Sequence, residues 1–204
     1  MNRAGRPRRA LLVGMTPNAD VVVDVGADHG HVAHALGAIA SERMPNRSGR
    51  TDVAWVIADG LAPFRHVDVA VIAGMGAMTI AGILARGPRP DVAVLHAQDD
   101  PPTLRRWLAA HGWRIEAEGL APEAKRFAEV IRAVPGVEPA KDLGLEFGPC
   151  LLQSGDPLLG AHLRQLRSWW GGIAQQTVDR AAEKHQHAVR RFDFLDSIIR
   201  KLAL

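Results

Sequence analysis

Residues 21–30, VVVDVGADHG, have the residue types and spacing of a ligand-binding turn. An apolar run leads through Asp24, Gly26, Asp28 and Gly30 into a helix-like stretch. Gly26 stands at the carboxyl end of the expected strand, where open α/β sheets bind ligands, and its missing Cβ lets a ligand approach the backbone. The dinucleotide fingerprint would be G-x-G-x-x-G, but Asp28 stands where its second glycine would be and would repel a pyrophosphate.

An acid-rich turn suits a cationic nucleoside better than a dinucleotide. S-adenosyl-L-methionine has no phosphate and carries an ammonium and a sulfonium group, which Asp24 and Asp28 would attract. The alternative is a tight strand-to-helix turn that binds no ligand. The Asp-Gly-Asp-Gly spacing after a strong strand favours the cofactor site, and the acid at position 28 disfavours a nicotinamide-dependent oxidoreductase.

Three further apolar runs end in residues that could contact a nucleoside. Glu42 ends the run AIASE, where a carboxylate can accept hydrogen bonds from both ribose hydroxyls. Asp59, followed by Gly60, ends the next run and can accept a hydrogen bond from an adenine amino group. The fourth run ends in AGMGAM, where Gly74 and Gly76 permit close approach. Each acid alone is more commonly a cap or a turn residue, but acids at successive strand ends together indicate a nucleoside site.

Other reaction chemistries find little support in the sequence. His29 and His31 flank the turn, but no zinc-ligand spacing occurs, so a metal site is disfavoured. The sequence contains neither a Ser-His-Asp pattern nor a P-loop. The single cysteine, Cys150, has no partner for an internal disulfide.

The elements that must position these residues alternate between short apolar runs and helical patterns. Near-continuous apolar strands of this kind belong to a parallel sheet buried on both faces. We expect strands at residues 21–25, 38–40, 53–57, 67–73 and 92–95, with helices at 31–36, 77–84 and 103–111. Residues 113–118 and 127–133 predict an antiparallel hairpin at the sheet edge. The order indicates a doubly wound α/β domain.

The spacing of the apolar residues changes after Pro157. Residues 134–156 indicate a linker that packs back on the domain, and an apolar stripe with helical spacing follows it. We expect one long helix or a helical hairpin, weakened internally by Gly171-Gly172. The predicted domains are residues 1–150, carrying the sheet, and residues 151–204, a C-terminal helical extension.

Composition and charge narrow the class of protein. The 204 residues are 47% hydrophobic and 23% charged, which is ordinary for a soluble globular protein. No apolar segment is long enough for a membrane span or a secretory signal, so we expect a cytoplasmic protein. The formal net charge is +3, and Arg3, Arg6, Arg8 and Arg9 concentrate positive charge at the N-terminus. Such an end either binds a phosphate backbone or is a disordered, solvated tail.

The chain resembles the bacterial tRNA (adenine(22)-N(1))-methyltransferases through VVVDVGADH, IADGL, DVAVIAGMGA, LRRWLAAHGWRIEAEGL, AEVIRAV and LEFGPCLLQSGDPLLGAHL. The resemblance implies a Rossmann-like methyltransferase sheet with a C-terminal coiled-coil-like extension. It also implies methyl transfer from S-adenosyl-L-methionine to N1 of an adenine in tRNA. By this resemblance the cofactor-binding residues are Asp24, Gly26, Asp28 and His29 in the turn, Glu42 at the ribose, Asp59 and Gly60 at the adenine, and Gly74, Met75 and Gly76 at the methionine end.

Asp28 is our candidate catalytic residue, because it faces the substrate side of the turn and can orient the amino group of the target base. Contacts to tRNA or another structured RNA are expected from the N-terminal arginines and from Arg164, Arg167, Arg180, Lys184, Arg190 and Arg191. The solvated face of a helix is the alternative for the C-terminal set. Trp169 and Trp170 could stack on bases, although packing between helices is the better explanation. The C-terminal helices also offer a surface for self-association.

Four departures from the family pattern fall near the expected site. One is His31, which stands where an aromatic residue usually follows the DH motif. Residues 43–51 are too short for the usual crossover helix and predict an irregular loop that leaves one side of the cofactor pocket open. His96-Ala97-Gln98 replaces Gln-Pro-Asn, and Ala77 replaces the last glycine of GMGG. The alternative function is therefore a catalytically weakened relative that binds RNA or a partner without turnover.

Overall fold

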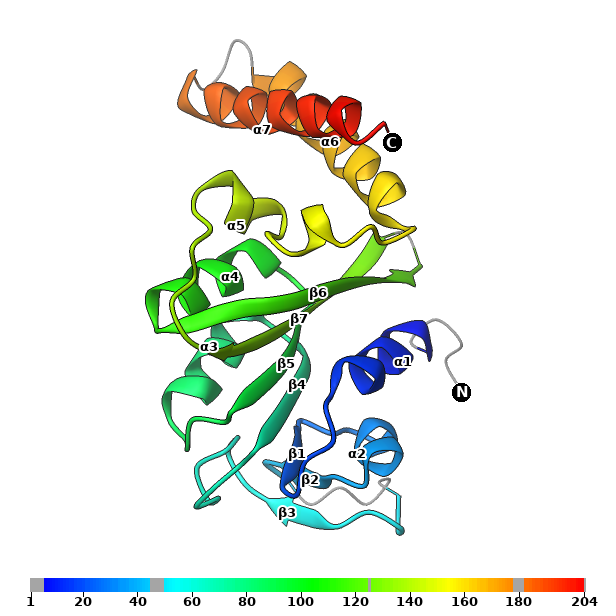
Figure 1. Ribbon diagram of the computed structural model, residues 1–204, viewed down its shortest axis with the longest axis vertical. Helices are drawn as coiled ribbons and strands as arrows, with labels where there is room; N and C mark the ends of the chain where they lie inside the picture. The colour runs from blue at the N-terminus through cyan, green and yellow to red at the C-terminus, as the bar shows by residue number, and fades with distance from the viewer. Residues whose placement is uncertain (1–5, 45–49, 125, 178–181, 204) are drawn as a thin grey trace. The chain divides into compact units, whose positions relative to one another are not determined.

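The computed structural model describes residues 6–44, 50–124, 126–177 and 182–203. The chain divides into two compact units, Met1–Ser154 and Gly155–Leu204, which are described separately. Figure 1 labels their helices and strands.

The first unit is built on a seven-stranded sheet in the order β3-β2-β1-β4-β5-β7-β6. Its strands are β1 (Val22–Val25), β2 (Ile39–Glu42), β3 (Trp55–Ile57), β4 (Val69–Met75), β5 (Val92–Ala97), β6 (Trp113–Glu123) and β7 (Arg126–Pro135). The first five strands are parallel to one another, and β7 runs antiparallel to both β5 and β6. The predicted α/β class and the antiparallel hairpin at the sheet edge are therefore confirmed.

Helices cover both faces of this sheet. They are α1 (Arg6–Met15), α2 (His31–Leu36), α3 (Ala77–Ala85), α4 (Pro101–Ala110) and α5 (Leu143–Phe147), with a short 3₁₀ turn η2 (Leu151–Gln153). Alternate strand residues separate two apolar cores: Val69 and Val71 pack with α1 and α2, whereas Ala70 and Ile72 pack with α3 and α4. This alternation places each strand's side chains against helices on opposite faces.

The basic N-terminal segment is a helix, which the sequence interpretation did not anticipate. Residues 6–15 form α1, and its Leu12 and Met15 are buried against the sheet. A disordered tail is therefore wrong for these residues; Arg3 lies outside the described residues. The apolar positions Leu11, Leu12 and Met15 recur at helical spacing, and their burial gives the helix a packed face.

The connection from β2 to β3 has no helical residue in its described part, residues 43–44 and 50–54. The remainder of the predicted irregular loop, residues 45–49, lies outside the described residues. After β7 the chain packs back on the domain as predicted, through α5 and η2. The Glu118 carboxylate accepts hydrogen bonds from the Cys150 and Leu151 N–H groups at 2.9 and 3.0 Å, which fixes this return.

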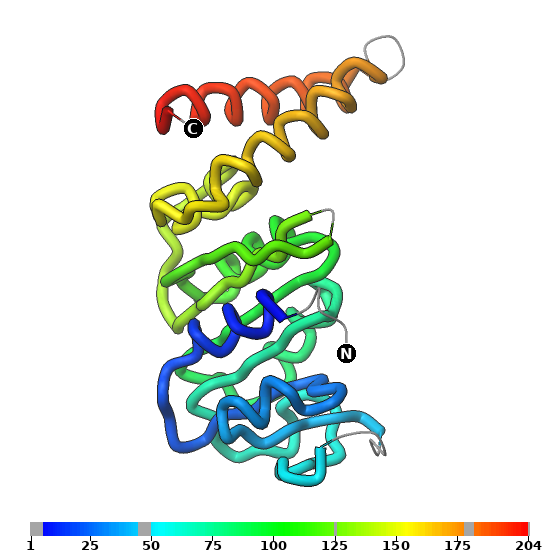
Figure 2. The backbone as a smooth tube through the Cα atoms, turned by 90° about the vertical axis from the view of Figure 1, so that its right-hand side faces the viewer, coloured from blue at the N-terminus to red at the C-terminus, as the bar shows by residue number. Residues whose placement is uncertain are grey.

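The second unit contains α6 (Leu159–Thr177) and α7 (Ala182–Lys201), which pack against each other as a helical hairpin (Figure 2). Gly171 lies inside α6, and a Cβ there would come within 3.1 Å of the Phe192 ring. The glycine thus favours close packing of the two helices, in addition to weakening α6 itself. Among the described helices, none is long and apolar enough to cross a membrane.

Candidate functional site

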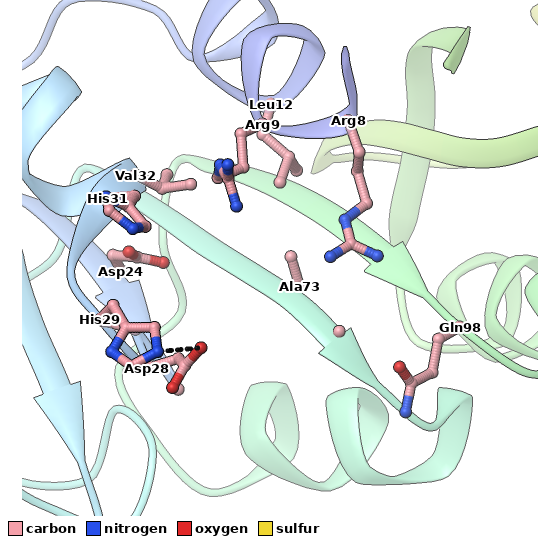
Figure 3. Close-up of a pocket in the computed structure, with 13 residues that line it drawn as sticks. Arg8, Arg9, Leu12, Asp24, Asp28, His29, His31, Val32, Ala73 and Gln98 are labelled. Atoms are coloured by element: carbon pink, nitrogen blue, oxygen red, sulfur yellow. Dashed lines mark ion pairs between the residues drawn. The ribbon is translucent and has the colours of Figure 1, made fainter. Parts of the chain in front are cut away.

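A cavity of about 330 Å³ opens at the carboxyl ends of β1 and β4 (Figure 3). Its lining brings together Asp24, Gly26, Asp28, His29 and Gly74, all predicted from the sequence. This is the place where parallel α/β sheets bind ligands, because the strand order reverses between β1 and β4. The volume falls in the range of small-molecule sites, which is roughly 300–1,000 Å³.

The turn after β1 has a backbone that few residues other than glycine adopt. Gly26 has φ of 69°, and a Cβ there would collide with the terminal methyl group of Met75. Asp28 has φ of 50°, in the left-handed region, which aspartate adopts more readily than most residues with a Cβ. The Asp28 N–H donates a hydrogen bond of 2.7 Å to Glu42 Oε1, which helps to hold this conformation.

Glu42 therefore lies behind the turn and does not line the cavity. It ends β2, the neighbour of β1 in the sheet, and its half-buried carboxylate supports the Asp28 backbone. This contact uses Oε1. The expected ribose contact would have to be made by the same carboxylate that shapes the turn.

The two aspartates of the turn have different surroundings. Asp24 is 4% exposed, and its Oδ2 accepts a hydrogen bond of 3.0 Å from the Ala33 N–H of α2. Burial raises the pKa of Asp24 to about 7, with a smaller contribution from the negative charge of Glu42. Asp28 is 80% exposed at its side chain, and one carboxylate oxygen lies 3.9 Å from Nε2 of His29. Asp28 is thus accessible to a second substrate, whereas Asp24 sits in the floor of the cavity.

Asp59 and Gly60 do not line the cavity. The Asp59 carboxylate lies 3.7 Å from both Arg43 and Arg86, and its side chain is 58% exposed. The Gly60 carbonyl accepts a hydrogen bond of 2.9 Å from the Ser41 hydroxyl. These residues follow β3, on the side of β2 away from the cavity.

The predicted residues that follow Gly74 also lie outside the cavity lining. Met75 is half-buried and covers Gly26 with its methyl group. Gly76 is the N-cap of α3, and Asp99 accepts a hydrogen bond of 2.8 Å from the following Ala77 N–H. A Cβ at position 76 would lie 2.8 Å from Asp99 Oδ2, so glycine is needed for this capping arrangement.

Among the lining residues that sequence reasoning did not assign to the site, three are long and polar: Arg8 and Arg9 of α1, and Gln98 after β5. The arginines stand in the basic N-terminal segment, which the sequence did not place beside the turn. Gln98 belongs to the segment His96-Ala97-Gln98, which departs from the family's Gln-Pro-Asn. This departure was the signal in the sequence that could have drawn attention to it. The cavity consequently has acidic groups on the side of the turn and basic groups on the side of α1 (Figure 3).

The residues of the cavity fit a cationic nucleoside cofactor. The N–H groups of Gly26, Asp28 and Gly30 already donate to oxygens of Ser41, Glu42 and Ala27, and the carboxylates of the turn would repel a pyrophosphate. Asp24 is buried without an ion-pairing cation among the described residues, and Gly26 and Gly74 keep the backbone open. A ligand ammonium group in this cavity would find a carboxylate that burial has left poorly solvated.

A family model described as tRNA (adenine(22)-N(1))-methyltransferase matches residues 35–198 of the chain. No sequence among the curated proteins matches it.

Several solved structures are similar over nearly the whole chain. A Streptococcus agalactiae protein of the NADB-Rossmann superfamily is 20% identical with a TM-score of 0.84, covering 98% of this chain and 97% of that one. Streptococcus pneumoniae Sp1610 in complex with S-adenosyl-L-methionine is 26% identical with a TM-score of 0.76, covering 94% and 98%. M. capricolum TrmK in complex with S-adenosyl-homocysteine is 19% identical with a TM-score of 0.79, covering 94% and 96%.

Proposed function

Because this chain belongs to the tRNA (adenine(22)-N(1))-methyltransferase family, we propose that it transfers a methyl group from S-adenosyl-L-methionine to N1 of an adenine in tRNA. The observation that carries the proposal is the cavity beside the turn from Asp24 to His29, at the carboxyl ends of β1 and β4. The acidic turn supports a cationic methyl donor over a dinucleotide.

In this proposal the turn and its neighbours hold the cofactor. Asp24 and Asp28 attract the ammonium group, while Gly26 and His29 border the same space. Glu42 binds the ribose and keeps the turn in place through the Asp28 N–H.

The nucleoside and methionine ends would extend to either side of the turn. Asp59 and Gly60 lie toward the adenine, and Asp59 would exchange an arginine contact for the adenine amino group. Gly74, Met75 and Gly76 lie toward the methionine end, and the Met75 methyl group over Gly26 would have to yield wherever the cofactor approaches that glycine.

S-adenosyl-L-methionine, when bound, supplies a methyl group on a cationic sulfonium. The residues of the chain have to align that group with adenine N1 and exclude water from the line of transfer. Asp28 is the catalytic candidate, because its exposed carboxylate at the turn can accept a hydrogen bond from the 6-amino group of the base. That contact would leave the N1 lone pair free to face the methyl group.

Changing Asp28 to Asn tests this role separately from cofactor binding. We expect Asp28→Asn to slow methylation even at a saturating concentration of S-adenosyl-L-methionine, where a weaker affinity for the cofactor no longer limits the rate. Full methylation at unchanged cofactor affinity would exclude Asp28 as a catalytic residue.

We further propose that α6 and α7 contribute phosphate contacts to tRNA. Arg164, Lys184 and Arg190 are exposed on these helices, and Trp169 is 57% exposed. Arg167 instead pairs with Asp196 at 2.7 Å and lies over the Phe192 ring, so it serves packing within the hairpin. Arg180 lies outside the described residues. Self-association through the same helices and a cytoplasmic location also belong to this proposal.

Trp170 has a different setting from Trp169. It is half-buried, and its ring meets the His187 ring edge-on with 5.6 Å between the ring centroids. The Arg191 guanidinium carbon lies 4.8 Å from the centroid of the Trp170 ring. These contacts favour helix packing over base stacking for Trp170, in line with the sequence interpretation. Arg191 is likewise engaged at this aromatic face.

The deciding experiment is methylation of an unmodified tRNA transcript with S-adenosyl-L-methionine labelled at the methyl group, followed by nucleoside analysis. We expect label in 1-methyladenosine and none when the target adenosine is replaced by guanosine. Cofactor and tRNA binding without methyl transfer would contradict the proposal and favour a non-catalytic relative.

A further inference from the structure

Helix α1 brings two guanidinium groups into the cavity, opposite the acidic turn. Figure 3 shows Arg8 and Arg9 entering from α1, with Asp24 and Asp28 across the cavity from them. Arg8 Nη1 donates to Glu123 Oε1 at 2.5 Å. Arg9 is half-buried, and within the described parts of the chain no carboxylate forms an ion pair with it.

Arg8 is held in place by long-range partners. The Glu123 side chain at the end of β6 is 16% exposed, and His96 of β5 is 2% exposed. Both approach the same atom, Arg8 Nη1, which lies 3.4 Å from Nε2 of His96. The guanidinium is therefore positioned before any ligand arrives.

The partners of His96 determine which of its ring nitrogens carries the proton. Nδ1 lies 3.1 Å from the Glu129 carbonyl oxygen, which can only accept a hydrogen bond. Arg8 Nη1 can only donate, so Nε2 is the acceptor and the ring is neutral. Burial lowers the pKa of His96, and the charge of Arg8 lowers it further, which agrees with this neutral form. The departure at position 96 from the family pattern thus has a physical role beside Arg8.

The two sides of the cavity carry opposite charges, which limits what the cavity can bind. A group with a cationic and an anionic end matches both sides at once. The amino-acid end of S-adenosyl-L-methionine is such a group, with an ammonium and a carboxylate on one carbon atom. An RNA phosphate in the same space would face Asp24 and Asp28 as well as the arginines, and is therefore matched less well.

We propose that Arg8 and Arg9 form the subsite that binds the carboxylate of the cofactor's amino-acid end, and that His96 and Glu123 are positioning residues for Arg8. A guanidinium presents paired N–H donors that match a carboxylate geometrically, and the contact is charge-assisted. The inference rests on the proposed function only in taking S-adenosyl-L-methionine as the ligand; it does not depend on which RNA is methylated.

The test compares two ligands that share the nucleoside. S-adenosylhomocysteine carries the amino-acid end, whereas 5′-methylthioadenosine lacks it. We expect calorimetry of Arg8→Ala and Arg9→Ala to show roughly tenfold weaker binding of S-adenosylhomocysteine, with the affinity for 5′-methylthioadenosine unchanged. Arg6→Ala is the matched control, because it removes one positive charge from α1 at an exposed position outside the cavity lining.

His96→Phe tests the positioning role by keeping a ring and removing both nitrogens. We expect His96→Phe to weaken the binding of S-adenosylhomocysteine and to leave the affinity for 5′-methylthioadenosine unchanged. A general disturbance of the structure would weaken the binding of both ligands. A preference for S-adenosylhomocysteine that stays the same in both arginine variants would overturn the carboxylate subsite.

The titrations contain no RNA, so they separate this inference from the proposed function. Arginine variants that keep the ligand preference but bind tRNA more weakly would assign the guanidinium groups to an RNA phosphate and overturn the subsite. Wild-type protein that binds neither compound would overturn both the subsite and the proposed function. Wild-type protein that shows the expected preference but methylates no tRNA would contradict the function alone.

Discussion

The first unit buries two charged groups, Arg105 and Asp24, in opposite ways. The Arg105 side chain is fully buried, and its Nε and Nη2 donate to Glu118 at 2.6 Å and to Glu129 at 2.5 Å. Burial alone would lower the pKa of Arg105, but the charges of both glutamates outweigh it and raise the pKa above its usual value. Asp24 has a single N–H donor from Ala33 and, among the described residues, no ion-pairing cation.

The difference distinguishes a structural charge from a binding group. The Arg105 cluster joins α4, β6 and β7 to the segment before Ser154, where Glu118 also receives the Cys150 N–H. Its charges are satisfied inside the protein and require no ligand. Asp24 lines a cavity with a pKa near neutrality, as expected of a carboxylate that receives a cation from outside.

The largest effect is expected on removal of the structural cation. Arg105→Ala removes the buried cation that Glu118 and Glu129 share and should lower the free energy of unfolding by about 3–5 kcal/mol in urea denaturation at pH 7. The neighbouring Arg106→Ala is the control, because Arg106 is 48% exposed and pairs with Glu146 at 3.0 Å. It should cost at most about 1 kcal/mol. Equal losses in the two variants would show that the buried cluster is not the stabilising feature.

The next effect concerns the support of the acidic turn. Glu42→Ala removes the acceptor of the Asp28 N–H and the proposed ribose contact, and should weaken S-adenosylhomocysteine binding by about 1.5–3 kcal/mol, roughly tenfold to a hundredfold, in calorimetry. Glu42→Gln retains an oxygen that can accept the N–H, so it should lose less. Unchanged affinity in Glu42→Ala would remove this residue from the site.

Cofactor binding should depend on pH through Asp24. An ammonium group in the cavity favours the deprotonated carboxylate, so binding should strengthen as the pH rises through about 7. We expect S-adenosylhomocysteine to bind up to roughly tenfold more tightly at pH 8 than at pH 6. Asp24→Asn should remove most of this dependence; a wild-type affinity that is flat over the same range would separate Asp24 from the ligand.

The last effect, of similar size, is on stability at the same residue. The pKa of Asp24 rises from 3.8 to about 7 on folding, so between these values the folded protein retains a proton that the unfolded chain has lost. Stability contributed by the protonated carboxyl is complete below 3.8 and is lost as the pH rises to about 7. Asp24→Asn should therefore increase the free energy of unfolding at pH 8 by about 1–2 kcal/mol, while weakening cofactor binding. A lower free energy of unfolding for Asp24→Asn than for the wild type at pH 8 would contradict the destabilising effect assigned to the buried, charged carboxylate.

Local patterns in the sequence were sufficient for the sheet and for the turn. Apolar runs bounded by glycine predicted the parallel strands, and the turn depends on Asp24, Gly26 and Asp28, which are close in the chain. Glu42 was recognised as important, but its contact with the Asp28 N–H depends on the pairing of β1 with β2, which spacing alone does not give. The acidic residue at the end of β2 therefore indicated a binding site, but not the contact that its carboxylate makes.

The α1 side of the cavity depends on contacts between distant parts of the chain. Arg8 meets Glu123 and His96 only after the hairpin of β6 and β7 joins β5. Four arginines near a chain end suggested a tail, because charge composition says nothing about where Leu12 and Met15 pack. Asp59 shows the converse: its type and position suggested a nucleoside contact, whereas Arg43 and Arg86 lie beside its carboxylate in the structure.

A crystal structure of the protein with S-adenosylhomocysteine would test the cofactor site most directly. We expect the amino-acid end between the turn at Asp24 and the guanidinium groups of Arg8 and Arg9, the ribose at Glu42, and Met75 displaced wherever the ligand approaches Gly26. Density for the ligand elsewhere, with Met75 still covering Gly26 and the cavity beside Asp24 filled only by solvent, would contradict the assignment of this cavity to the methyl donor.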